Sequence, residues 1–289
     1  MLLKGGLDER TPGHVPSYIA EAVFFEKWAP NLEINLPHAY WTAVEAGRQG
    51  LVLLEDLDTR GAHYGYATLP VTAAEARVAV QLLATLHARY WESPLLASLR
   101  SYTDRFAAPD YVLGKLLESG NYKGALAGAR GETAPKLLRE PEGMWQALRA
   151  LWRHTNSGPQ CFCHADAHLG NFFYEPDGRA GLLDWQAYSR CNPMFDVSYF
   201  LCGALTPEDR RMHETGIIKE YLATLRSAGV QEPPTFDDAW LFYRRFALHG
   251  FIWAGVTGSN YADEMIEAYA RRYGQACTDL RTVDALGIV

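Results

Sequence analysis

The sequence has 289 residues, 48% of them hydrophobic, and its 27 basic and 34 acidic residues leave a net charge of −7. A chain of this length and composition can fill the core of one large domain or two modest ones without disulfides or metal ions to hold it together. The acidic excess argues against nucleic acid or an anionic membrane as the main partner.

The cysteines and the amino terminus both bear on the compartment. Five cysteines is an odd number, and the one close pair, Cys161 and Cys163, is expected to share a face of a strand rather than to form a bridge. The start MLLKGGLDER reaches charge and glycine too early for an apolar signal region, and no uninterrupted apolar run approaches bilayer length. We therefore expect reduced thiols that pack in the core of a cytoplasmic protein.

The first part of the chain is predicted to hold short strands around one helix. Apolar and alternating patterns indicate strands over Leu2–Lys4, Pro37–Val44 and Gly50–Asp56. Ser17 is placed to cap a helix that runs through YIAEAVFFEKWA and stops at Pro30.

From Thr72 onward the sequence is mainly helical. Thr72 and Glu75 can form a capping box, and the helix that follows ends before Pro94. Glycine, alanine and charged residues are mixed near 119–135, which favours a flexible excursion. Another helix is predicted to end near His154.

The last part begins with two short strands joined by the turn Pro176-Asp177-Gly178. Thr206 then caps a helix with proline at its first position, and three helices are predicted near 207–228, 236–256 and 260–283. The sequence thus predicts an α+β chain, with a small strand-rich part followed by a large helical part.

Residues 161–174, CFCHADAHLGNFFY, concentrate polar and thiol groups that invite a metal-site interpretation. In an extended strand His164, Asp166 and His168 would share one face as three zinc ligands. The sequence Leu-Gly-Asn at 169–171 breaks such a strand, and no second His/Cys pair follows at ligand spacing. Zinc hydrolysis is therefore a minor hypothesis, and a thiol nucleophile is weaker still because QCFCH indicates burial.

Spacing favours a different chemistry. His164-x-Asp166, then Asn171, then Asp184 after two leucines follow the order of phosphotransferase catalytic loops. Asp166 would orient an acceptor hydroxyl and take its proton, while Asn171 and Asp184 would supply oxygen ligands for Mg²⁺. His164 would be a scaffold residue whose ring hydrogen-bonds the backbone around Asp184.

HADAHLGN together with LLDWQ resembles the aminoglycoside phosphotransferase and choline kinase family, and the likeness covers nearly the whole chain. The motifs LHARYW, VLLEDL and NPMFDVSYFL make the ecdysteroid-kinase-like branch the most similar one. The resemblance implies a protein-kinase-like, two-lobed fold with a partial N-terminal lobe and hinge over 1–57 and a helical C-terminal lobe over 58–289. It also implies ATP and Mg²⁺ as cofactors.

Further roles are implied by the resemblance. Three hinge residues would meet adenine through their backbone: Glu55, Asp56 and Leu57. Asp196 would brace the catalytic loop from the following helix, and it could equally cap the helix VSYFL. The sequence departs from the family pattern at Ala165, where glycine or arginine is usual. Trp185-Gln186 replaces the Phe-Gly of protein kinases, which argues against protein substrates.

A lysine and a glutamate that hold the nucleotide phosphates are also expected in this fold, and the candidates are Lys4 and Glu21. No residues then remain before Lys4 for two strands and a glycine-rich loop, so the small lobe would be a three-stranded remnant with an unpaired edge. Three explanations are open: a truncated or misassigned start, which we favour, a naturally degraded phosphotransferase, or another segment or partner that completes the sheet.

The acceptor is the least constrained feature. The late helices are rich in aromatic residues, for which core packing is the default interpretation: Trp240, Phe242, Tyr243, Phe246, Phe251, Trp253 and Tyr261. An apolar hydroxylated small molecule suits such helices better than a polycationic aminoglycoside. The leading hypothesis is a small-molecule kinase, and the alternative is a non-catalytic, pseudokinase-like nucleotide-binding protein.

Overall fold

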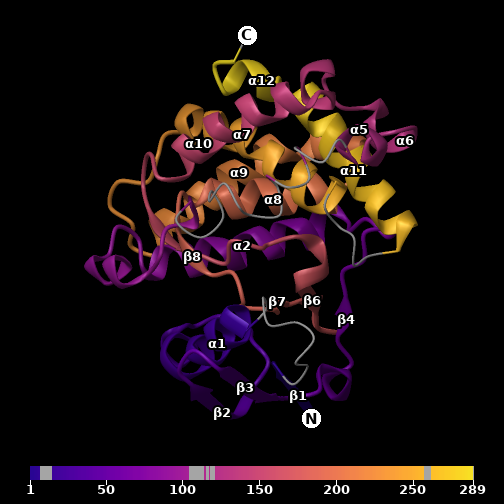
Figure 1. Cartoon of the computed structure of the whole chain (residues 1–289). Coiled ribbons are helices and arrows are strands. Elements are labelled where there is room, and N and C mark those ends of the chain that lie inside the picture. The colour runs from indigo at the N-terminus through magenta and orange to yellow at the C-terminus, as the bar shows by residue number, and fades with distance from the viewer. Residues whose placement is uncertain (7–14, 104–113, 115–116, 118–120, 257–261, 289) are drawn as a thin grey trace.

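A computed structural model describes residues 1–6, 15–103, 114, 117, 121–256 and 262–288. Figure 1 shows a small lobe that contains the N-terminal sheet and α1, and a larger lobe built mostly of helices. The β6–β7 hairpin lies between them. The α+β class predicted from the sequence is therefore confirmed, and the division at residue 57 stays a prediction.

The small lobe is a three-stranded antiparallel sheet covered by one helix. Its strands lie in the order β1-β3-β2, and their bounds are Leu2–Gly5 for β1, Ala39–Glu45 for β2 and Gln49–Leu54 for β3. Helix α1, Val15–Val23, packs against β3. A Cβ at Gly50 would lie 2.4 Å from the carbonyl oxygen of Tyr18, so the close approach of α1 requires glycine there.

The helix predicted over YIAEAVFFEKWA is wrong at both ends. The helix already begins at Val15, because Pro16 fits a first turn, so Ser17 lies inside it and does not cap it. After Val23 the backbone continues as a π-helical turn, Phe24–Trp28, and a 3₁₀ turn, Ala29–Asn31. The wider turn lets the consecutive Phe24 and Phe25 both face the core.

Helix α2, Ala73–Arg89, follows a short strand, β4, His63–Tyr64. The predicted capping box is confirmed, because Glu75 N donates to Thr72 Oγ1 at 3.2 Å and Thr72 N donates to Glu75 Oε2 at 2.8 Å. Helix α2 packs on α9 in the centre of the large lobe.

The region expected to be a flexible excursion contains two short helices, α5, Asn121–Ala125, and α6, Ala129–Glu132. Helix α7, Pro141–Thr155, ends where the sequence predicts. Four short strands follow: β5, Cys161–Cys163; β6, Phe172–Tyr174; β7, Ala180–Leu182; and β8, Ser189–Cys191. Strand β5 pairs with β8, and β4, β6 and β7 form a second small sheet.

The remaining helices enclose α8, Met194–Ala204, in which every residue is buried. They are α9, Pro207–Ser227; α10, Phe236–Gly250; α11, Asp263–Asp279; and α12, Thr282–Ala285. The helix predicted to reach residue 256 ends at Gly250 and gives way to a π-helical turn, Phe251–Val256. Thr206 caps α9 as predicted.

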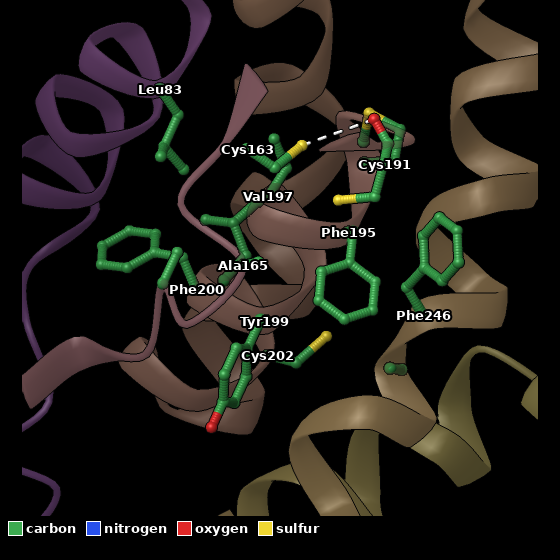
Figure 2. Packing of buried hydrophobic residues seen from close by; sticks show 14 of the residues in the cluster. Leu83, Cys163, Ala165, Cys191, Phe195, Val197, Tyr199, Phe200, Cys202 and Phe246 are labelled. Carbon is green, nitrogen blue, oxygen red and sulfur yellow. Dashed lines mark hydrogen bonds between the residues drawn. The ribbon is translucent and has the colours of Figure 1, made fainter. Parts of the chain in front are cut away.

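Side chains of α8 form the centre of the core. Figure 2 shows Phe195, Val197, Tyr199, Phe200 and Cys202 of this helix among side chains from β5, β8 and α10. All five cysteines are free and buried, so the prediction that they pack in the core is confirmed. None of the helices in the described ranges has the length and apolarity needed to cross a membrane.

Candidate active site

A buried carboxylate holds the loop that follows β5. Asp196, in the first turn of α8, accepts hydrogen bonds from the backbone N–H of His164 at 2.7 Å and of Ala165 at 2.9 Å. Ala165 has φ = 63°, a left-handed conformation in which two successive N–H groups can point at one carboxylate. The contact expected of Asp196 as a brace is therefore present. The alternative, a helix cap, is wrong because Pro193 occupies the cap position.

Asp196 has a further buried partner that the sequence did not reveal. His87 Nε2 lies 3.2 Å from Asp196 Oδ2, and His87 Nδ1 lies 2.8 Å from the hydroxyl oxygen of Tyr221. Both His87 and Asp196 have no exposed surface. A histidine on the apolar face of α2 was the available signal, since a buried imidazole requires polar partners.

His164 connects this loop to the segment that carries Asp184. Its Nε2–H donates to the carbonyl oxygen of Leu183 at 2.7 Å, which is the contact the sequence predicts. Its Nδ1 accepts from the backbone N–H of Asp166 at 3.3 Å, so both ring nitrogens are used by the neutral form. Burial lowers the pKa of His164 and keeps it neutral.

Asn171 positions Asp166 through its amide nitrogen. Asn171 Nδ2 donates to the backbone oxygen of Asp166 at 2.8 Å and to Asp166 Oδ2 at 3.3 Å. Because the nitrogen points at Asp166, the amide oxygen is turned the other way. The backbone oxygen of Asn171 accepts from Leu183 N at 2.9 Å, which sets Asn171 beside the segment that ends in Asp184.

Lys4, Glu21 and Asp184 meet although they come from three separate elements. Lys4 Nζ lies 2.9 Å from Glu21 Oε2 and 3.0 Å from Asp184 Oδ1. Glu21 is buried, and burial raises its pKa while Lys4 opposes that shift. Burial acts to lower the pKa of Lys4, but Asp184 and Glu21 outweigh it and raise the pKa, so the ammonium stays charged.

The side-chain oxygens of Asn171 and Asp184 are of a kind that suits a hard divalent cation. Asn171 offers an amide oxygen and Asp184 a carboxylate that is 38% exposed. These are the ligand types that Mg²⁺ prefers. Asp184 has φ = 56°, so its backbone is also held in the left-handed region. The donor set therefore fits Mg²⁺.

The hinge residues are occupied by local contacts. Glu55 N donates to the carbonyl oxygen of His38 at 2.8 Å, and Arg60 Nε donates to Glu55 Oε1 at 2.7 Å. The hydrogen bond from Arg60 lowers the pKa of Glu55. Asp56 caps the turn Leu57–Arg60, and Leu57 is buried. Their side chains thus fix the chain direction between β3 and β4.

The zinc interpretation of the catalytic loop is not supported by the geometry. The strand ends at Cys163, and within the described ranges His164, Asp166 and His168 do not converge as metal ligands. His168 Nδ1 instead accepts from Gly170 N at 3.0 Å. A tetrahedral zinc site requires all its ligand atoms at one point.

The aromatic rings of two tyrosines pack beside His168. Tyr199 and Tyr269 have ring centroids 5.8 Å and 6.1 Å from that of His168. Of the aromatic residues named from the sequence, Tyr243, Phe246 and Phe251 are buried in the core as the default interpretation predicts. Trp253 is half-buried near His249, and Tyr261 lies outside the described residues.

Three solved structures with similar folds are distant from this chain in sequence. The microcompartment-associated aminopropanol kinase is 16% identical with a TM-score of 0.54, and the match covers 99% of this chain and 87% of that one. The choline kinase LicA from Streptococcus pneumoniae is 15% identical, with a TM-score of 0.49 and coverage of 96% and 85%. Aminoglycoside 2′-phosphotransferase-IIIa, solved as a GDP complex, is 11% identical, with a TM-score of 0.49 and coverage of 96% and 86%.

The first of these likenesses extends over almost the whole chain, and the predicted protein-kinase-like fold, α+β with a large helical lobe, is confirmed. No curated protein matches the sequence. The model of the phosphotransferase enzyme family matches residues 10–286, which is nearly the entire chain, and the protein therefore belongs to that family.

Proposed function

We propose that this protein transfers the γ-phosphoryl group of ATP, in the presence of Mg²⁺, to a hydroxyl group of a small molecule. One continuous set of contacts carries the proposal. Asp166 accepts a hydrogen bond from the Asn171 side chain, and the backbone oxygen of Asn171 accepts one from Leu183 N, next to Asp184. Asp184 is paired with Lys4, which is paired with Glu21. These contacts support assigning a base, two oxygen ligands and a phosphate-binding cation to one site.

Asp166 is the base in this proposal. Its carboxylate accepts a hydrogen bond from the acceptor hydroxyl and orients that oxygen toward the γ-phosphorus. The hydroxyl oxygen forms a bond to phosphorus as the bond to the bridging oxygen of ADP breaks, and the proton passes to Asp166. His164 and Asp196 act as positioning residues, because they bind backbone groups of the loop.

Asn171 and Asp184 hold Mg²⁺, and Lys4 binds the α- and β-phosphates. The bound ion supplies positive charge that neutralises the phosphate oxygens during transfer. Glu21 keeps the Lys4 ammonium in place through the 2.9 Å ion pair. The backbone of Glu55, Asp56 and Leu57 meets adenine, which the engagement of their side chains elsewhere supports.

The acceptor in this proposal is an apolar hydroxylated compound, as the likeness to the ecdysteroid-kinase-like branch suggests. We place the reaction in the cytoplasm, where five free cysteines remain reduced.

The test is acceptor-dependent release of ADP from Mg·ATP. The panel holds choline, aminopropanol, an aminoglycoside, a macrolide and apolar alcohols that include a sterol. Asp166→Asn should lower the rate about 10²- to 10⁴-fold with any acceptor that turns over, while ATP affinity measured by calorimetry changes little. Asp237→Asn, an exposed carboxylate on α10, is the matched control and should retain the parent rate.

The alternative is a non-catalytic nucleotide-binding protein. It predicts ATP binding that Lys4→Met weakens, with no ADP release for any acceptor in the panel. If ADP release occurs but Asp166→Asn leaves it unchanged, the assignment of the base is wrong.

A further inference from the structure

A group of arginines lies at the end of the large lobe farthest from the sheet. Helices α7, α10 and α12 meet there, next to the C-terminal end of the chain (Figure 1). Their side chains surround a hollow of about 500 Å³, whose lining includes His154, Arg244, Arg245 and Arg281. A second hollow on the same helix, α7, is lined by Arg149 and Arg153. None of these residues belongs to the candidate active site.

The protein neutralises part of the positive charge around the larger hollow, whose lining also includes the carboxylate of Asp284. Within the described ranges, the only ion pair made by these arginines joins Arg281 to Asp284 at 2.6 Å. Arg244 Nε donates to the carbonyl oxygen of Leu280 at 2.6 Å, and Arg245 Nε donates to that of Ala285 at 2.9 Å. Arg244 Nη2 also donates to the carbonyl oxygen of Arg281 at 3.5 Å. Neutral carbonyl groups therefore fix both guanidinium groups, and within the described ranges neither has a carboxylate partner.

Neighbouring cations repel one another here. Burial and the nearby Arg244 lower the pKa of Arg245, and burial, Arg245 and Arg153 lower the pKa of His154. A local excess of positive charge in a protein with a net charge of −7 is unexpected unless a ligand offsets it. A compact anion with several oxygens would accept from both guanidinium forks and remove the repulsion.

We propose that this hollow binds a phosphate group, either as inorganic phosphate or as part of a small phosphomonoester. Arg244 and Arg245 bind the phosphate oxygens, and Arg281 at the rim and Arg153 in the neighbouring hollow add positive charge. The arrangement suits phosphate because planar guanidinium groups present paired N–H donors at the spacing of its oxygens. The site is separate from the proposed nucleotide site and does not depend on it.

The experiment is calorimetric titration of the full chain with inorganic phosphate and with glycerol 3-phosphate, at constant ionic strength set with chloride. We expect a dissociation constant of about 1 mM or lower for at least one of them. Arg244→Gln/Arg245→Gln should weaken that binding at least about tenfold. Arg226→Gln, an exposed arginine on α9, removes the same kind of charge elsewhere and should leave the affinity unchanged.

Two further variants keep the result unambiguous. Should the double variant fail to fold, Arg153→Gln/Arg281→Gln removes two exposed charges, in the neighbouring hollow and at the rim, and should still weaken binding about threefold or more. Lys4→Met disables the proposed nucleotide site and should leave phosphate affinity as in the parent. Loss of binding in Lys4→Met, or equal affinity in the double variant and the parent, would overturn the proposal, as would no binding up to about 50 mM of either anion.

Discussion

The catalytic-loop segment and the N-terminal sheet both contribute candidate active-site side chains, but the core encloses only the first. His164 and Asp196 have no exposed surface, and each is hydrogen-bonded to backbone groups of another segment. On strand β1, by contrast, the side chains of Leu2 and Leu3, which precede Lys4, are 57% and 50% exposed.

The two regions therefore fix their functional groups by different means. The loop is positioned by packing and buried hydrogen bonds, which tolerate little change. Lys4 is positioned by ion pairs with Glu21 and Asp184, and the pair with Asp184 connects the two lobes. Substitutions in the loop should accordingly cost more stability than substitutions in β1, and four measurements test that difference.

The largest effect is expected for Asp196→Ala. It leaves the N–H groups of His164 and Ala165 and the ring of His87 without their common acceptor inside the core. We expect the free energy of unfolding in urea to fall by about 3–5 kcal/mol. Asp237→Ala, in the exposed first turn of α10, should cost far less. Equal losses for the two variants would mean that Asp196 does not brace the loop.

Acidification should destabilise the loop next. Burial lowers the pKa of His168 from 6.5 to about 4. Between pH 6.5 and 4, His168 is therefore protonated in the unfolded chain but neutral in the folded chain. The free energy of unfolding falls as the pH drops through this range. The contribution is about 3 kcal/mol, since one pKa unit corresponds to about 1.4 kcal/mol.

Urea unfolding between pH 7 and 4.5 measures this contribution. His168→Asn keeps an acceptor for Gly170 N but removes the titrating ring, so its stability should depend less steeply on pH than that of the parent. The half-exposed His213 provides a matched control in His213→Asn. Parallel curves for the parent and His168→Asn would contradict the prediction.

Lys4→Met should have an intermediate effect on stability. It leaves Glu21 buried beside Asp184 without the cation, at a cost of about 1–3 kcal/mol. The double variant Lys4→Met/Glu21→Gln should recover part of this loss, because the uncompensated carboxylate is gone. Lys27→Met, on an exposed lysine, should cost much less. Additive losses in the double-mutant cycle would show that the two residues do not interact.

The smallest effect is expected on the exposed side of β1. Leu3→Ser should change the free energy of unfolding by no more than about 0.5 kcal/mol, because the side chain is half exposed. Leu54→Ser on β3, where the side chain is 7% exposed, should cost several times more. A large loss for Leu3→Ser would mean that this edge of the sheet is covered in solution.

Local chemistry made parts of the fold predictable. Thr72 with Glu75 and Thr206 before Pro207 were read correctly as helix starts, and Pro176-Asp177-Gly178 as a turn between two strands, because each signal acts within a few residues. The change from α-helix to a π-helical turn at Phe24 was not predicted, since Phe24 packs against Trp185, with rings 4.0 Å apart, and these residues are 161 positions apart in sequence.

The sequence alone determined the family and the order of the candidate residues, because the spacing of His164, Asp166, Asn171 and Asp184 reflects one loop and one hairpin. Only the tertiary structure decided that Lys4 reaches both Glu21 and Asp184, that His87 supports Asp196, and that several arginines gather at the far end of the large lobe. Contacts of this kind join distant segments, and their distances depend on how whole helices and sheets pack.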